Sequence, residues 1–271
     1  MTATILLGTF SLLLLLNIPI AVCLGIAGVI IFLLNGMPFT PIPINFYTGL
    51  NKFVLLAIPF FILAGNVMEK AGISQKLIDF ARSLVGHKRN GMAIVCVAVS
   101  CFFAAISGSG PATVAALGVI VIPAMISAGY PNNSSSALMA TSGAIGLIIP
   151  PSISFVVFGS ITGVSIAELF MAGMLPGVLM GICLCVAMFI VARKFELRPL
   201  PRTSARERWK SFFDAFWAIM MPVIILGGIY GGIFTPTEAA AVACVYGLIV
   251  GIFIYRTLKL EELYRTFVDS A

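Results

Sequence analysis

The chain has 271 residues, of which 60% are hydrophobic and 10% charged, and its mean hydropathy is +1.12. Soluble domains carry about 25% charged residues, so this composition excludes a soluble globular protein. The apolar runs are long and continuous rather than alternating, which excludes a transmembrane β-barrel and predicts an all-α polytopic membrane protein within the lipid bilayer. The net charge of +6 lies mainly in short loops, as membrane orientation requires, and predicts no nucleic-acid partner.

Residues 1–72 are predicted to form scaffold membrane helices. Ile5–Leu34 is one apolar stretch, long enough to span the membrane with tilt, and a kink is expected at Asn17 and Pro19. Residues 35–51 hold three prolines and are predicted to form a loop or an irregular surface segment. Phe53–Met68 then returns through the membrane.

Residues 73–89 change character, because apolar side chains recur at helical spacing between polar ones. This pattern predicts an amphipathic arm helix that lies in the membrane interface. Its apolar face comprises Ile73, Leu77, Ile78, Ala81, Leu84 and Val85.

Residues 90–129 are predicted to form a re-entrant hairpin. No charged residue occurs from Asn90 to Ala167. Within this interval Met92–Ile106 and Thr113–Ser127 are two apolar arms joined by the letters SGSGP, and each is shorter than the roughly 20 residues that a full crossing needs. Two complete spans would give the same orientation of the remaining chain, so arm length alone favours the hairpin.

Residues 130–162 are predicted to form a broken helix. Gly143 and Gly146 are followed by Pro150, Pro151 and Ser152, which stop the helix before another apolar half begins. Non-helical backbone at membrane depth is tolerated only where protein or water covers it, so two such breaks indicate a site.

Residues 163–256 are predicted to form further membrane helices around a basic cytoplasmic loop at 193–210, the strongest positive-inside signal in the chain. Ala172–Val191 spans, Trp209–Trp217 re-enters, and Ile219–Phe234 and Ala239–Tyr255 span. This path places the amino terminus in the cytoplasm, residues 35–51 outside, and the open end of the hairpin in the cytoplasm.

Enzymatic chemistry is not indicated. His87 is the sole histidine and lies in a charged loop, so Ser109 has no imidazole partner for a protease mechanism. Glu168 and Glu238 each occupy the third position of a capping box, which favours a structural role. The six cysteines lie in apolar segments without a CxxC pair and are interpreted as small buried side chains.

Discontinuous helices near the bilayer midplane are a way in which secondary transporters bind ions and substrates. Here the hydroxyls of Ser107, Ser109, Thr113 and Ser152 are oxygen ligands suited to Na⁺, with Gly108, Gly143 and Gly146 leaving carbonyls accessible. An interval without charge fits a Na⁺ site of neutral oxygens better than a proton relay. The alternative is that these small residues only let helices pack closely.

Three stretches carry a family resemblance: AAISGSGPATVAALG at 104–118, GAIGLIIPPS at 143–152 and GGIFTPTEAAAVA at 231–243. They resemble the large membrane subunit of tripartite ATP-independent periplasmic (TRAP) transporters, the DctM-like family. IPFFILAGNVMEKAG at 58–72 and LVGHKRNG at 84–91 extend the similarity over essentially the whole chain.

The resemblance implies a large permease subunit in the bacterial inner membrane that couples Na⁺ to import of an organic acid, a C4-dicarboxylate or a sialic acid. It implies no cofactor beyond Na⁺, and two partners: a small membrane subunit of four helices and a periplasmic substrate-binding protein. The implied fold is similar to the ion transporter superfamily, with two inverted repeats and an elevator movement. On this chain the implied Na⁺ ligands are Ser107, Gly108, Ser109, Gly110, Pro111, Thr113, Gly143, Gly146 and Pro150, and the residues nearest the substrate are Ser109, Thr113 and Ser152.

Members of this family continue into a second hairpin and a second broken helix beyond the point at which this chain stops. Residues 257–271 are interpreted as the start of a second arm helix, with an apolar face of Leu263, Tyr264, Phe267 and Val268. The chain is thus expected to hold the first repeat plus scaffold helices, and alone not to form a two-sided substrate site. The alternative function is a truncated, non-transporting membrane fragment that only docks partner subunits.

Overall fold

The computed structural model describes residues 2–258 and 260–270 and divides the chain into two compact units, Met1–Asn51 and Lys52–Ala271. Its helices are α1 (Thr2–Leu15), α2 (Ile20–Leu34), α3 (Pro41–Leu50), α4 (Ala57–Lys70), α5 (Ile73–Val85), α6 (Gly91–Ser107), α7 (Gly110–Ser127), α8 (Asn132–Ala144), α9 (Ile153–Thr162), α10 (Ile166–Val191), α11 (Ala205–Tyr230), α12 (Pro236–Ile249) and α13 (Leu260–Ser270). Short 3₁₀ turns lie at Phe53–Leu56, Ile145–Leu147 and Ala192–Lys194, and α12 continues into a π-helical turn, Val250–Ile254.

Five helical segments of the described chain are long and apolar enough to cross a membrane by length and composition: Phe53–Lys70, Gly110–Ser127, Ile166–Lys194, Ala205–Tyr230 and Pro236–Ile254. The expectation of an all-α polytopic membrane protein is thereby confirmed.

The first unit corrects the expected single kinked span. Asn17 adopts a left-handed φ of 61° and Pro19 precedes α2, so the chain turns back and α1 packs against α2 as a helical hairpin. Proline suits this position because α2 starts directly after it, where a missing N–H costs nothing. Within the expected loop at 35–51, Pro41 begins the short helix α3, which proline favours at its first turn.

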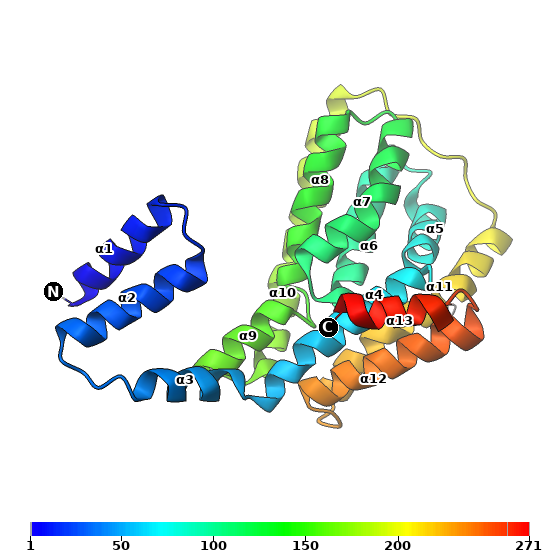
Figure 1. Cartoon of the computed structure of the whole chain (residues 1–271). Helices are drawn as coiled ribbons and strands as arrows, with labels where there is room; N and C mark the ends of the chain where they lie inside the picture. The colour runs from blue at the N-terminus through cyan, green and yellow to red at the C-terminus, as the bar shows by residue number, and fades with distance from the viewer. Residues whose placement is uncertain (1, 259, 271) are drawn as a thin grey trace. The chain divides into compact units, whose positions relative to one another are not determined.

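In the second unit α6, α7, α8 and α10 run side by side (Figure 1). Helix α4 packs against α12 and α13, and α5 packs against α6 and α11. The amphipathic helix predicted at 73–89 is α5: Ile73, Leu77 and Ile78 are buried, whereas Leu84, expected on the same face, is 44% exposed.

One further expectation differs from the structure. The predicted interruption between Trp217 and Ile219 is absent, because α11 is one helix that passes through Pro222. Pro222 is buried against neighbouring helices, and such packing lets a membrane helix tolerate proline. In α13 the polar Thr266 and Ser270 are buried, while Tyr264, Phe267 and Val268 of the expected apolar face are exposed.

The segment between α10 and α11 crosses the open ends of two other elements. Arg198 N–H donates to the Ala128 carbonyl after α7 at 2.9 Å, and Leu200 N–H donates to the Gly86 carbonyl after α5 at 3.1 Å. Thr203 Oγ1 donates to the Ser83 carbonyl at 2.8 Å. The basic segment, the end of α5 and the open end of the α6–α7 hairpin therefore lie together.

Candidate functional site

The tip of the α6–α7 hairpin is a two-residue connection. Gly108 follows α6 with a φ of +62°, a left-handed conformation that glycine adopts without steric cost. Ser109 precedes α7 as its N-cap, and its Oγ accepts from Ala112 N–H at 3.4 Å. The helices therefore extend closer to the tip than expected, with Ser107 ending α6 and with Gly110 and Pro111 opening α7.

Three residues of the tip form a small oxygen cluster. Thr113 Oγ1 donates to the Ser109 carbonyl at 2.8 Å and lies 3.2 Å from Ser107 Oγ. Ser107 Oγ is also 3.4 Å from the Ser109 carbonyl. Thr113 is fully buried and Ser107 is 3% exposed, so the cluster lies inside the protein.

The break between α8 and α9 runs from the 3₁₀ turn at Ile145–Leu147 to Ser152. Ser152 Oγ donates back to the Leu147 carbonyl at 2.7 Å and makes no capping bond to α9. Among the described residues, no N–H or hydroxyl donates to the four carbonyls from Ile148 to Pro151. These carbonyls are oxygen atoms that a cation could use.

The tip and the break are in backbone contact. Ile153 N–H donates to the Gly108 carbonyl at 3.2 Å. A Cβ on Gly108 would lie 2.7 Å from the Pro151 oxygen, and one on Gly110 would lie 2.9 Å from the Gly143 oxygen. A Cβ on Gly146 would lie 3.2 Å from Gly110 N. These glycines are thus required for close packing, as the alternative interpretation of the sequence predicts. The same packing assembles the candidate site.

Four helix ends converge at this contact. The carboxyl ends of α6 and α8 carry partial negative charge, and the amino ends of α7 and α9 carry partial positive charge. The first pair can attract a cation and the second pair an anionic group. The arrangement therefore offers opposite partial charges at one place without using an ionised side chain.

The structure brings together most of the predicted residues. Ser107, Gly108, Ser109, Gly110, Thr113, Gly143, Gly146 and Ser152 meet through the contacts described above, and Pro150 is buried beside them in the break. Pro111 is exposed. Of the three residues expected nearest the substrate, Thr113 and Ser152 are fully buried, and only Ser109 is partly exposed.

Two residues of α4 lie near the site but were not predicted from the sequence to do so. A Cβ on Gly65 would lie 3.2 Å from Ser107 Cα, so α4 touches the tip. The adjacent Asn66 donates from Nδ2 to Ser270 Oγ of α13 at 2.8 Å. An amide inside an apolar membrane helix is the signal that could have identified this neighbour.

The acidic residues have structural roles. Thr235 Oγ1 accepts from Glu238 N–H at 3.3 Å, and Glu238 Oε2 accepts from Thr235 N–H at 2.8 Å, so the predicted capping box is confirmed. At Glu168 only one half forms, with Ser165 Oγ accepting from Glu168 N–H at 3.4 Å. In the described part of the chain, no group of three or more His, Cys, Asp or Glu side chains could hold a metal ion.

Comparisons with known proteins agree on one family. The family model described as "Tripartite ATP-independent periplasmic transporter, DctM component" matches residues 7–271. The chain is 38% identical over 286 residues to the C4-dicarboxylate TRAP transporter large permease protein DctM of Rhodobacter capsulatus, covering 100% of this chain and 65% of the relative.

Two other relatives carry different substrate names. The chain is 43% identical over 269 residues to the isethionate TRAP transporter permease protein DctMQ of Oleidesulfovibrio alaskensis, covering 98% of this chain and 42% of that protein. It is 40% identical over 222 residues to the sialic acid TRAP transporter permease protein SiaT of Haemophilus influenzae, covering 82% of this chain and 36% of that protein.

The chain thus spans between about a third and two thirds of the length of these curated relatives. Their names describe permeases and not enzymes, in agreement with the non-enzymatic interpretation of the sequence. Together with the match over residues 7–271, they show that this multi-pass membrane chain belongs to the DctM component family of tripartite ATP-independent periplasmic transporters.

Proposed function

We propose that the chain belongs to the large permease subunit of a Na⁺-coupled, binding-protein-dependent importer of an organic acid. The convergence of four helix ends at the hairpin tip and the helix break is the observation that carries this proposal. The proposed substrate is a C4-dicarboxylate or a sialic acid, the substrates in the names of two of the relatives. Isethionate, the substrate in the name of the third, also carries an acidic group.

In this proposal Na⁺ binds among neutral oxygens at the tip and the break. Ser107 Oγ, Thr113 Oγ1 and the Ser109 carbonyl already lie within hydrogen-bond distance of one another, and the free carbonyls around Pro150 are a second source of ligands. Hard cations favour oxygen ligands, and carboxyl ends of helices add partial negative charge. The acid is held by the amino ends of α7 and α9, with Ser109 nearest to it.

The proposed setting is the bacterial inner membrane, with the amino terminus and the basic residues 193–210 in the cytoplasm. The proposed partners are a small four-helix membrane subunit and a periplasmic substrate-binding protein that delivers the acid. The α6–α7 hairpin and the α8–α9 element would belong to a part that moves across the membrane by an elevator mechanism.

Calorimetric titration of the purified full chain with NaCl, against KCl, tests the ion site. Ser107→Ala and Thr113→Ala should weaken Na⁺ binding by about ten-fold or more, because an interaction with a charged group contributes about 1.5–3 kcal/mol. Ser127→Ala and Thr141→Ala are matched controls, since these hydroxyls bond only to carbonyls of their own helices and are exposed.

Normal Na⁺ affinity in both tip variants would refute the ion-site assignment. A wild-type chain that binds no Na⁺ but co-purifies with the small membrane subunit would instead support the fragment that only docks partners. Na⁺-dependent uptake of succinate or N-acetylneuraminate in proteoliposomes with both partners separates the two substrate classes.

A further inference from the structure

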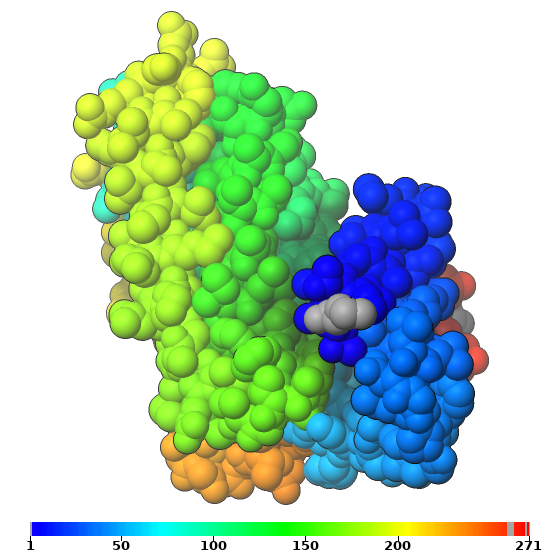
Figure 2. Space-filling model, turned by 90° about the vertical axis from the view of Figure 1, so that its left-hand side faces the viewer, coloured from blue at the N-terminus to red at the C-terminus, as the bar shows by residue number. Residues whose placement is uncertain are grey.

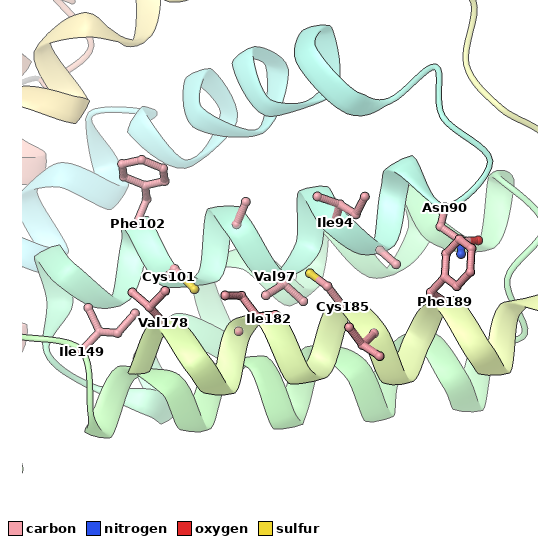
Figure 3. Close-up of a pocket in the computed structure, with 14 residues that line it drawn as sticks. Asn90, Ile94, Val97, Cys101, Phe102, Ile149, Val178, Ile182, Cys185 and Phe189 are labelled. Atoms are coloured by element: carbon pink, nitrogen blue, oxygen red, sulfur yellow. The ribbon is translucent and has the colours of Figure 1, made fainter. Parts of the chain in front are cut away.

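An apolar groove with a volume of about 550 Å³ lies between α6 and α10, and one end of it is lined by Ile149 of the break between α8 and α9 (Figure 3). Its walls are apolar side chains such as Val97, Val178 and Ile182, and Asn90 is the polar residue at its end. Helix α10 is open to the surroundings along much of its length, as its yellow-green surface shows in Figure 2. The groove is open to the surroundings of the helix, because Val178, Ile182 and Phe189, which line it, are about half exposed.

The groove has the depth of one membrane leaflet. Asn90 and Phe189 lie at one end, and Phe102 and Val178 lie at the other (Figure 3). Along α6, the rise from Asn90 to Phe102 is about 18 Å. One leaflet of the hydrocarbon core is about 15 Å deep, half of about 30 Å. An extended acyl chain that enters at Asn90 would end near Phe102.

The Asn90 end is positively charged. The guanidinium of Arg193 lies 5.4 Å from the centroid of the Phe189 ring, which lines the groove. Lys88, Arg89 and Lys194 are exposed and lie within two residues of Asn90 or Arg193 in the chain, and Glu196 is the acidic residue nearby. A negatively charged group is attracted to this end.

Asn90 adds a second, independent observation. It is 8% exposed, its Oδ1 has no hydrogen-bond partner, and its side chain makes no capping bond although it precedes α6. A buried amide without a partner costs free energy unless another polar group satisfies it. A glycerol hydroxyl of a lipid head group can donate to Asn90 Oδ1, while the phosphate beside it accepts from the amino end of α6.

We propose that this groove binds an anionic phospholipid, with one acyl chain between α6 and α10 and the phosphate beside Asn90 and Arg193. A partner helix fits the groove less well, because a helix is about 10–12 Å across with its side chains and would cover the cavity without filling it. Basic pockets between membrane helices on the cytoplasmic side are typical sites for anionic head groups.

A neighbouring cavity provides an internal contrast. It also measures about 550 Å³, shares Cys101, Phe102 and Val178 with the groove, and continues toward Tyr230 of α11. Among the described residues no cation lines either cavity, but the groove alone includes the amide of Asn90 and the ring of Phe189, over which Arg193 lies. Head-group selectivity is therefore assigned to the Asn90 end alone.

The test is native mass spectrometry of the purified full chain with equal amounts of dioleoylphosphatidylglycerol and dioleoylphosphatidylcholine. The wild type should retain at least five-fold more of the anionic lipid. Ile182→Trp, which fills the groove, should reduce that retention at least five-fold. Leu179→Trp is the matched control, because Leu179 is 58% exposed on the same helix, Ile182 is 56% exposed, and Leu179 does not line the groove.

The head-group contact has its own pair of variants. Arg193→Gln should bring the ratio of the two lipids close to one, whereas Arg206→Gln, which removes the same charge from an exposed site on α11, should leave it unchanged. Equal lipid retention in both tryptophan variants would overturn the groove as the site. Equal effects of both arginine variants, or no preference in the wild type, would overturn the phosphate contact.

Native cysteines give a readout that needs no substitution. Cys185 lines the groove, and Cys183 on the same helix is exposed outside it. Added phosphatidylglycerol should slow the modification of Cys185 by N-ethylmaleimide at least three-fold relative to Cys183. Protection of Cys185 by a co-purified membrane protein in lipid-free detergent would identify a protein occupant and overturn the proposal.

Discussion

At Gly108 two demands coincide on one backbone position. Its φ is +62°, and a Cβ would lie 2.7 Å from the Pro151 oxygen. We expect Gly108→Ala to lower the free energy of unfolding by about 1–2 kcal/mol for the left-handed backbone and by a further 1–3 kcal/mol for overpacking. Gly163→Ala separates the two terms, because Gly163 has a φ of +76° with open space around it.

Thermal unfolding of both variants in detergent, followed by circular dichroism, provides the measurement. Equal losses in the two variants would show that the contact with Pro151 contributes nothing. A larger loss for Gly108→Ala would confirm that the tip and the break are held in close backbone contact.

We expect the stability of the fold to depend on pH through His87. Desolvation, followed by the positive charges of Arg202, Arg208 and Lys88, lowers the pKa of His87 below its ordinary value of 6.5. The unfolded chain therefore binds this proton more readily than the folded chain, and stability falls as pH drops below about 6.5. His87→Gln should show a smaller decrease in melting temperature between pH 7.5 and pH 5.5. An unchanged decrease would assign the effect to other groups.

Single residues are predictable from the sequence where the signal is local. The letters SGSGP predict a tip because glycine and proline act on their own backbone, and the tip lies where expected. The contact of Gly65 with Ser107 joins residues far apart in the chain, so it depends on how α4 packs and no local pattern encodes it. The ion-binding roles of the tip residues stay a prediction.

Among the elements, the start of α12 depends on a reciprocal cap. Thr235→Ala removes the acceptor for Glu238 N–H and should cost about 1 kcal/mol of stability. Glu238→Gln should cost less, because glutamine can also return a bond to Thr235 in a capping box. The melting temperatures of both variants check this order, and Ser165→Ala, which removes a weaker, one-sided cap, serves for comparison. A larger loss for Glu238→Gln would mean that the charge itself matters.

Helix boundaries were predictable where caps define them and unpredictable where tertiary packing decides. The capping signals at Thr235 and Ser165 mark real helix starts. Proline was a less reliable signal, because Pro222 lies inside a continuous helix whereas Pro19 follows a full reversal of the chain. The difference is that Asn17 adopts a left-handed conformation before Pro19, which composition alone does not reveal.

Within the second unit, the tip of the α6–α7 hairpin ends against the break between α8 and α9. Helices α6 and α7 have 17 and 18 residues, about 26–27 Å, which is longer than the predicted arms. Arm length therefore no longer separates a hairpin from two spans. The tip instead meets the break inside the α8–α9 element, which places the tip between the two ends of that element. This position supports the re-entrant interpretation.

Labelling in right-side-out membrane vesicles tests this arrangement. Ser127→Cys lies at the open end of the hairpin, and Thr162→Cys lies at the far end of α9; both positions are exposed. A membrane-impermeant maleimide added outside should modify Thr162→Cys and leave Ser127→Cys unmodified until the vesicles are permeabilised. Modification of both cysteines from outside would contradict a crossing between them.

The two backbone bonds from residues 198 and 200 have a mechanical consequence. Through these bonds the segment between α10 and α11 connects Gly86, after α5, with Ala128, at the open end of the hairpin. Each such bond contributes about 0.5–1.5 kcal/mol, so pulling these parts away from each other loses both contributions. If the hairpin moved, the segment between α10 and α11 and the end of α5 would move with it as one rigid part. We therefore expect bending at Gly72, which lies between α4 and α5 with a φ of +74° and open space around it.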